Sequence, residues 1–239
     1  MSKLIITVVL VFCVTNLYSQ DVEIIRAGNI KLPKVKWKEN FPLIEKSIDT
    51  TSLTFIATYK VSGKINKLNI IDHFYLIHEK AKKIGANAYT LDYYYSDTAN
   101  NIATTIMSTY FVSNAVLIQN DKLKPKNIIY IFGDDKIFLK NKTTSFEVNG
   151  VVKEIKNTTE YFKYQLKNGE KVILSKGDAI GPIMTIDGEK DRSALYFRVS
   201  GFNAGVQPVP MGVTFNSGQI HPTDKNLSEF LSLILKSIE

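Results

Sequence analysis

The sequence predicts an α+β fold: an N-terminal βαββ unit, then an antiparallel β meander forming a sandwich or small barrel, then a C-terminal helix. Three observations predict it. Apolar residues recur at helical spacing over residues 70–84, between two alternating segments. Asn-Gly and Asp-Gly pairs separate short apolar runs in the second half of the chain. A further apolar stripe at helical spacing follows Asp224.

Residues 1–19 have the three parts of a secretory signal peptide. Lys3 supplies the positive charge, Leu4 to Val14 is an apolar run, and a short segment with polar and small residues ends at Ser19. The run is too short to cross a bilayer, which needs about 20 apolar residues. We therefore expect export to the periplasm, the outer surface or the medium, with a mature chain that begins at Gln20. A buried N-terminal helix fits less well, because no polar face interrupts the run.

The only cysteine, Cys13, lies within this signal. Lipid attachment to it requires a small preceding residue, whereas Phe12 stands there. The mature chain is then expected to have no disulfide, no thiolate nucleophile and no cysteine-based metal site. No other cofactor is indicated by the sequence.

The formal net charge of +7 becomes +6 once Lys3 is removed, with +2 on residues 20–121 and +4 on residues 122–239. Both signs are interleaved along the chain. This distribution fits weak attraction to an anionic surface and argues against nucleic-acid binding. After signal cleavage no apolar stretch is long enough for a transmembrane segment.

The first domain, residues 20–121, is expected to contain a strand at 53–61 and a helix at about 70–84. Asn69 is the predicted N-cap of this helix, and Gly85 suits a left-handed stop. The predicted buried stripe ends at Ile84.

Two more strands are expected, at residues 87–95 and 102–118. Alternation would place Tyr89, Leu91, Tyr93 and Tyr95 on one face of the first of them. The strand–helix–strand order predicts a right-handed parallel crossover, with the last strand pairing antiparallel.

Residues 81–88, Ala-Lys-Lys-Ile-Gly-Ala-Asn-Ala, carry the end of the helix into a strand. This segment resembles small bacterial βαββ domains, including the YbjQ-like family and the outer-membrane stress-sensor lipoprotein of the Rcs pathway. The resemblance implies an envelope domain of interaction type, with no active site to carry over. The cysteines of the Rcs lipoprotein are absent here, so the resemblance does not extend to disulfide-based sensing. A helix stop at Gly85 followed by small alanines also explains the segment structurally.

The polar residues 120–127 include Pro125 and are interpreted as the boundary of a second domain, residues 122–239. Turn signals between short apolar runs predict an antiparallel meander in this domain. In chain order they are Gly133-Asp134-Asp135, Asn149-Gly150, Asn168-Gly169 and Asp187-Gly188. Residues 201–218 are expected to be a Gly/Pro-rich loop. The helix after Asp224 has its apolar stripe from Leu227 to Ile238 and should cover a sheet face.

No catalytic motif is present in the sequence. His73 and His78 lie five residues apart on a helix, which prevents them from gripping one metal ion together. Asp187, Glu189 and Asp191 offer oxygens in a turn, but their spacing and the interleaved cations favour a solvated turn over a calcium site.

An extracytoplasmic hydrolase that uses carboxylates of the second domain is the alternative function. Glu154 with Glu160, or Asp178 with another acid, are the pairs to consider. A deep pocket that gathers two acids, or His221, would favour this alternative.

Two segments are candidate binding sites. Lys34, Lys36 and Lys38 share one face of an extended segment, either as a basic strip or as an edge strand whose lysines discourage pairing. Phe202, Met211 and Phe215 lie in the Gly/Pro-rich segment, either as binding contacts or as core residues beneath the last helix. We thus expect a non-enzymatic exported protein that binds another envelope protein or an anionic surface.

Overall fold

The computed structural model describes residues 22–29, 41–133, 143–176, 181–200, 203–207, 212–216 and 218–239, with only the backbone described for 203–207 and 212–216. The helices are α2 (Ile70–Lys83), α3 (Asn114–Leu123) and α4 (Lys225–Ile234), with a 3-10 turn η2 (Thr50–Ser52). The strands are β1 (Glu23–Ala27), β2 (Thr54–Lys64), β3 (Ala88–Asp97), β4 (Ile102–Phe111), β5 (Ile128–Gly133), β6 (Thr143–Val148), β7 (Val151–Lys156), β8 (Glu160–Gln165), β9 (Lys171–Ser175), β10 (Ile183–Asp187), β11 (Leu195–Val199), β12 (Asn203–Gln207), β13 (Gly212–Asn216), β14 (Ile220–Pro222) and β15 (Lys236–Ile238). The predicted α+β class is confirmed.

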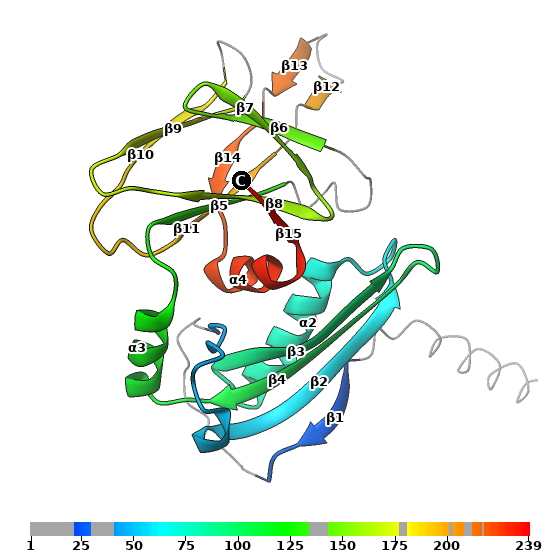
Figure 1. The fold of residues 1–239 in the computed structure, drawn as a ribbon. Coiled ribbons are helices and arrows are strands. Elements are labelled where there is room, and N and C mark those ends of the chain that lie inside the picture. The colour runs from blue at the N-terminus through cyan, green and yellow to red at the C-terminus, as the bar shows by residue number, and fades with distance from the viewer. Residues whose placement is uncertain are drawn as a thin grey trace, which may run out of the picture.

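The N-terminal half is a four-stranded sheet in the order β1-β2-β4-β3, with α2 against one face (Figure 1). Both β2 and β3 pair antiparallel with β4. They therefore run parallel to each other but are not neighbours, because β4 lies between them. The expected strand–helix–strand unit is present in this split form, and the last strand pairs antiparallel as predicted.

Helix α2 begins and ends where its sequence predicts. The Asn69 side chain accepts a hydrogen bond from the backbone N–H of Asp72, and the Asp72 carboxylate accepts one from that of Asn69, each at 3.0 Å. Gly85 has φ +92°, so it forms the left-handed stop. Ile84 is 45% exposed, and its predicted place in the buried stripe is wrong.

Strand β3 contains a bulge that changes which side chains reach the core. The pairing register with β4 shifts between Leu91 and Tyr93. Tyr89 is buried and Tyr94 packs against the core, whereas Tyr93 and Tyr95 are about half exposed. The prediction that Tyr89, Leu91, Tyr93 and Tyr95 share one face is wrong because the extra residue reverses the alternation.

The predicted strand over residues 102–118 is too long. Strand β4 ends at Phe111, and α3 begins after Ser113, whose side chain accepts from the backbone N–H of Val116. A short apolar run such as Val116–Ile118 fits a strand and a helix equally well by pattern. The serine cap and the packing of Val116 and Leu117 on a small core decide for the helix.

The C-terminal half contains two sheets that face each other across a second core. One sheet, β10-β9-β6-β7, is antiparallel, and the other has the order β14-β11-β5-β8-β15. In the second sheet β11 pairs parallel with β5, and β15 pairs parallel with β8. The predicted antiparallel meander is therefore wrong for these pairs, and no closed barrel forms among the described residues.

One of the predicted turn pairs forms a hairpin, and two others connect different sheets. Asn149 and Gly150 have φ +51° and +76° and join β6 to its partner β7. The turn at 168–169 instead joins β8 to β9, and the turn at 187–188 joins β10 to β11, which belong to different sheets. These two turns lie side by side, because the backbone N–H of Gly169 donates to the carbonyl of Gly188 at 2.7 Å.

The segment expected to be a loop, residues 201–218, contains a short hairpin of β12 and β13. Strand β15 replaces the predicted last turn of the C-terminal helix, because α4 ends at Ile234. The predicted N-cap of this helix is confirmed, since the Asp224 carboxylate accepts from the backbone N–H of Leu227 at 2.8 Å.

Helix α4 lies between the two sheets of the C-terminal half and helix α2 (Figure 1). Leu227, Phe230 and Leu231 are buried in a core that also contains Tyr130 from β5 and Phe74 from α2. The Phe74 and Phe230 rings are 5.4 Å apart. One core therefore draws residues from both sides of the proposed 121/122 boundary, which itself falls within α3. The division into two separately folding units stays a prediction.

Within the described ranges, no helix has both the length and the apolar content needed to span a bilayer.

Candidate functional site

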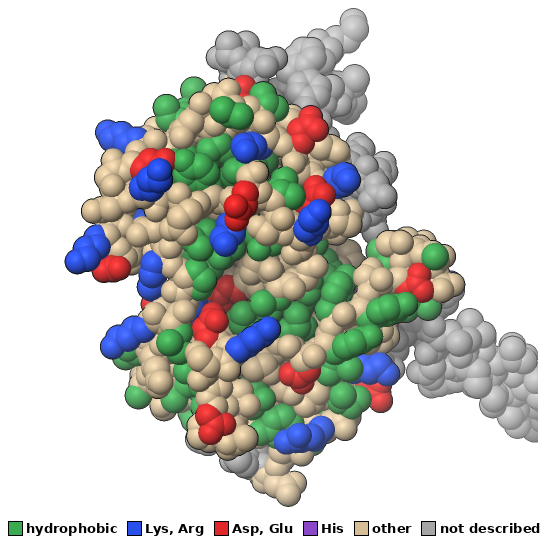
Figure 2. Space-filling model, viewed as in Figure 1, with side chains coloured by type: hydrophobic (Ala, Val, Ile, Leu, Met, Phe, Trp, Pro, Cys, Tyr) green, Lys and Arg blue, Asp and Glu red, His purple; other side chains and the backbone are tan. Residues whose placement is uncertain are grey.

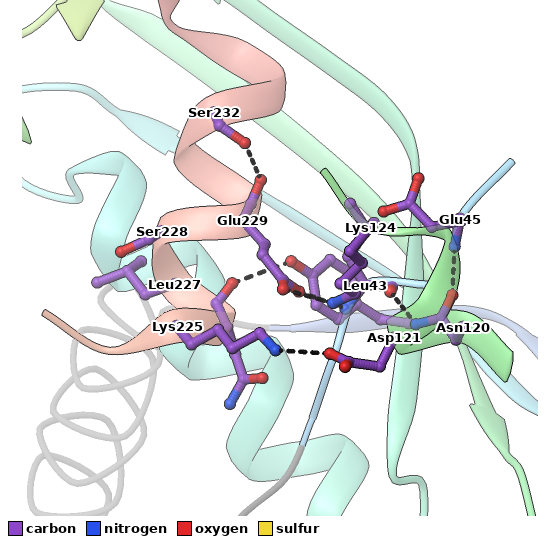
Figure 3. Close-up of polar contacts among 12 residues, drawn as sticks. Leu43, Glu45, Asn120, Asp121, Lys124, Lys225, Leu227, Ser228, Glu229 and Ser232 are labelled. Carbon is purple, nitrogen blue, oxygen red and sulfur yellow. Dashed lines mark hydrogen bonds and ion pairs between the residues drawn. The ribbon is translucent and has the colours of Figure 1, made fainter. Parts of the chain in front are cut away.

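Polar side chains from α3, α4 and residues 41–45 meet where the two halves of the fold join (Figure 3). Lys124, directly after α3, donates through Nζ to Oε1 of Glu229 on α4. The two side chains are only 7% and 6% exposed. Burial of an ion pair is costly unless the remaining polar atoms also find partners. The surroundings of this pair supply them.

Glu229 has a second donor from the N-terminal half. Its Oε2 accepts from the backbone N–H of Leu43 at 3.1 Å. Burial lowers the pKa of the Lys124 ammonium, and the attraction of Glu229 opposes that shift. Burial likewise raises the pKa of the Glu45 carboxyl, which Lys124 opposes. One cation therefore lies among two carboxyl groups in a poorly hydrated junction.

The buried side chain of Asn120 links α3 to the same segment. Its Oδ1 accepts from the backbone N–H of Glu45, and its Nδ2 donates to the carbonyl of Leu43, both at 2.8 Å. An amide that both accepts from and donates to one backbone segment fixes that segment's position. Three segments far apart in the chain are thus held together by hydrogen bonds.

Three tyrosines also lie near the buried ion pair. The Tyr89 hydroxyl donates to the carbonyl of Asn226 in the first turn of α4, at 3.1 Å. The rings of Tyr130 and Tyr196 are stacked, with centroids 5.1 Å apart. Burial, with smaller effects of neighbouring tyrosines and acids, raises the pKa of Tyr130 to about 12 and that of Tyr196 further. These phenols stay neutral and serve as packing and hydrogen-bonding groups.

An open cleft of about 450 Å³ lies beside this junction, between α3 and the start of α4. Pro42, Leu117 and Ile118 form its apolar part. Polar residues form the rest, and they are Asn120, Asp121, Lys122, Lys124, Lys225 and Asn226. The size is within the range of small-molecule pockets. Figure 2 shows basic and acidic side chains next to one another on the surface where the two halves of the fold meet.

The charges at the cleft are paired with one exception. The Asp121 carboxylate accepts from Lys225 Nζ at 3.1 Å and lies 3.5 Å from Lys126 Nζ. Lys124 is held by Glu229. Lys122 is exposed and has no ion-pair partner within the described residues.

Two carboxylates at the cleft and the junction beside it are engaged in ion pairs. A general base needs a carboxylate or imidazole that is free to accept a proton from a substrate. Asp121 and Glu229 are instead held by lysines. Within the described ranges, no three His, Cys, Asp or Glu side chains are grouped so that they could hold a metal ion.

The side chains of the predicted binding residues all lie outside the part of the chain that the structure describes. Lys34, Lys36, Lys38, Phe202 and Met211 lie outside the described residues. Phe215 is on β13, where the backbone alone is described.

The described groups considered for hydrolysis or metal binding are not among the residues that line the cleft. Glu154 and His221 are exposed, and Glu160 accepts from the backbone N–H of Lys156. His73 is buried beneath the sheet, while the His78 ring stacks on Phe41 at 4.6 Å. In the turn at 187–191, Arg192 donates to the carbonyl of Asp187 and to Glu189. Asp178 is outside the described residues.

Sequence reasoning missed Lys124, Glu229 and Asn120. Lys124 and Asn120 lie in a polar stretch that reads as an exposed linker, and Glu229 lies opposite the apolar stripe of α4. A helical-wheel argument would place Glu229 in solvent. It is buried because α4 is covered on more than one side, as the burial of every residue from Leu227 to Leu231 shows.

Comparisons of the chain with protein-family models, with curated protein sequences and with solved structures find no significant match.

Proposed function

We propose that this protein is an exported, non-enzymatic binding protein of the cell envelope or the medium, and that the cleft between α3 and α4 receives its partner. The observation that carries the proposal is an open cleft with an apolar side at Leu117 and Ile118 and charged groups that, apart from Lys122, are already paired. Such a surface offers contact area and directional polar groups.

The construction of the cleft supports this proposal. Its wall is fixed by Asn120 and by the buried pair of Lys124 and Glu229. A wall that is rigid before binding loses little conformational entropy on binding. The hydrolase alternative requires two acids converging on one pocket, and the cleft has Asp121 as its one acidic lining residue.

Site-specific photo-crosslinking in the native host tests the site. A photoreactive amino acid at position 118 should yield a discrete adduct with an envelope component, because Ile118 is 60% exposed at the cleft. Val152 is 61% exposed on β7 and provides the matched control position. Adducts of equal yield from both positions, or none from position 118, would contradict the proposal.

Export is part of the proposal and has its own test. The apolar run of residues 4–14 and its flanks support removal of residues 1–19. Mass spectrometry of protein from the native host should find a chain that begins at Gln20 or within a few residues of it. A cytoplasmic chain that retains Met1 would show that the signal assignment is wrong, and Cys13 would then have to be considered as a thiol.

A further inference from the structure

The cationic groups at the cleft outnumber its anionic groups. Lys122, Lys124 and Lys225 line it together with one acid, Asp121. Glu229 neutralises Lys124 from behind the wall, and Asp121 is shared between Lys225 and Lys126. Asp121 is thus shared by two ammonium groups while Lys124 is attracted by both Glu229 and Glu45, and Lys122 is the cation left without a partner among the described residues. A ligand that brings a negative charge is favoured electrostatically here.

The same helix also presents apolar surface to solvent. Ile118 is 60% exposed and Leu123 is 46% exposed, while Asn120 is the one buried residue of α3. Exposed apolar side chains beside a cleft supply contact area once a partner excludes water from them. Within the cleft itself, Ile118 lies with Pro42 and Leu117 in the apolar part of the lining.

We infer that the cleft binds an acidic peptide segment of a partner protein: a carboxylate lies against Lys122 and Lys225, and an adjacent bulky apolar side chain packs on Ile118. This inference rests on the proposed function and specifies its ligand. A peptide fits better than a compact anion because the cleft combines its lysines with an apolar part formed by Pro42, Leu117 and Ile118. No covalent chemistry is involved, and Asn226 at the cleft provides a further polar contact.

Selection of short random peptides against the purified mature protein tests the inference. Selected sequences should be enriched in Asp and Glu next to Leu, Ile or Phe. The variant Lys122→Glu should weaken binding of a selected peptide by about tenfold, as expected for loss and reversal of one charge contact. High salt should weaken wild-type binding in the same direction.

The control is Lys190→Glu, which makes the same charge change at an exposed lysine in the turn near residues 187–191. It should bind the selected peptide as the wild type does. Circular dichroism of both variants should confirm that they are folded. Ile118→Ser should weaken peptide binding without changing its salt dependence.

Three results would overturn the inference. They are selection of peptides without acidic enrichment, equal binding by wild type and Lys122→Glu, and Lys122-dependent binding to phosphatidylglycerol vesicles with none to peptides. The last result would identify an anionic membrane surface as the partner. Each of these leaves the photo-crosslinking result at position 118 intact, so the ligand class can fail while the site itself stands.

Discussion

Glu229→Gln should lower the free energy of unfolding by about 3–5 kcal/mol at neutral pH, as removal of one partner of a buried ion pair commonly does. The glutamine keeps an acceptor for the backbone N–H of Leu43, so the principal loss is the charge opposite Lys124. The ammonium group is then buried without its strongest counter-ion. Glu45 also attracts Lys124 and moves the expected value toward the lower end of the range. Urea denaturation gives the measurement.

The double variant Lys124→Met with Glu229→Gln distinguishes the charge from the packing. With both charges removed, no uncompensated ion remains in the junction, so the double variant should be more stable than the sum of the single effects implies.

Asp187→Asn is the exposed control. Its partner Lys171 lies 3.9 Å away, and the side chains of Lys171 and Asp187 are 77% and 59% exposed. That change should be worth less than about 1 kcal/mol. Strict additivity in the double variant would show that the two side chains do not interact energetically.

The buried histidine of α2 should make the fold sensitive to acid. His73 is fully buried, and its Nδ1 lies 2.9 Å from Thr105 Oγ1 on β4. Burial lowers its pKa from 6.5 to about 4. The unfolded chain binds a proton near pH 6.5, whereas the folded chain does so only near pH 4. Between these values the unfolded state holds the extra proton, so stability falls as the pH falls.

The expected loss from this one group is about 3 kcal/mol between pH 7 and pH 4, at roughly 1.4 kcal/mol for each pKa unit. His73→Gln should lower stability at neutral pH but flatten its dependence on pH over this window. The exposed His221 supplies the control, since His221→Gln removes a histidine and should leave the acid profile unchanged. Unfolding free energies measured from pH 7 to pH 4 provide the comparison. A profile for His73→Gln parallel to that of the wild type would rule out His73 as the source.

Several elements could be predicted because their signals are local. The cap at Asn69, the stop at Gly85 and the spacing of Phe74, Ile77 and Ala81 specify α2 within one stretch of chain. The Asn149-Gly150 pair likewise specifies its hairpin, since both residues adopt positive φ there. Each of these signals concerns residues a few positions apart.

Pairing between distant strands could not be predicted in the same way. The parallel pairs of β5 with β11 and of β8 with β15 join residues far apart in sequence. A turn pair such as 168–169 has the same local chemistry whether its strands pair with each other or enter different sheets. The two facing sheets, rather than the turn, determine which of these occurs.

By itself, the sequence determined the α+β class, the length and capping of α2 and the start of α4, because hydrogen bonds and apolar spacing within one segment are sufficient for these. Only the tertiary structure decided the candidate site. Lys124 and Glu229 read as solvated charges along the chain, and their burial follows from α4 packing between the two halves. Exposure of a side chain depends on what covers it, and that cover comes from residues far away in the sequence.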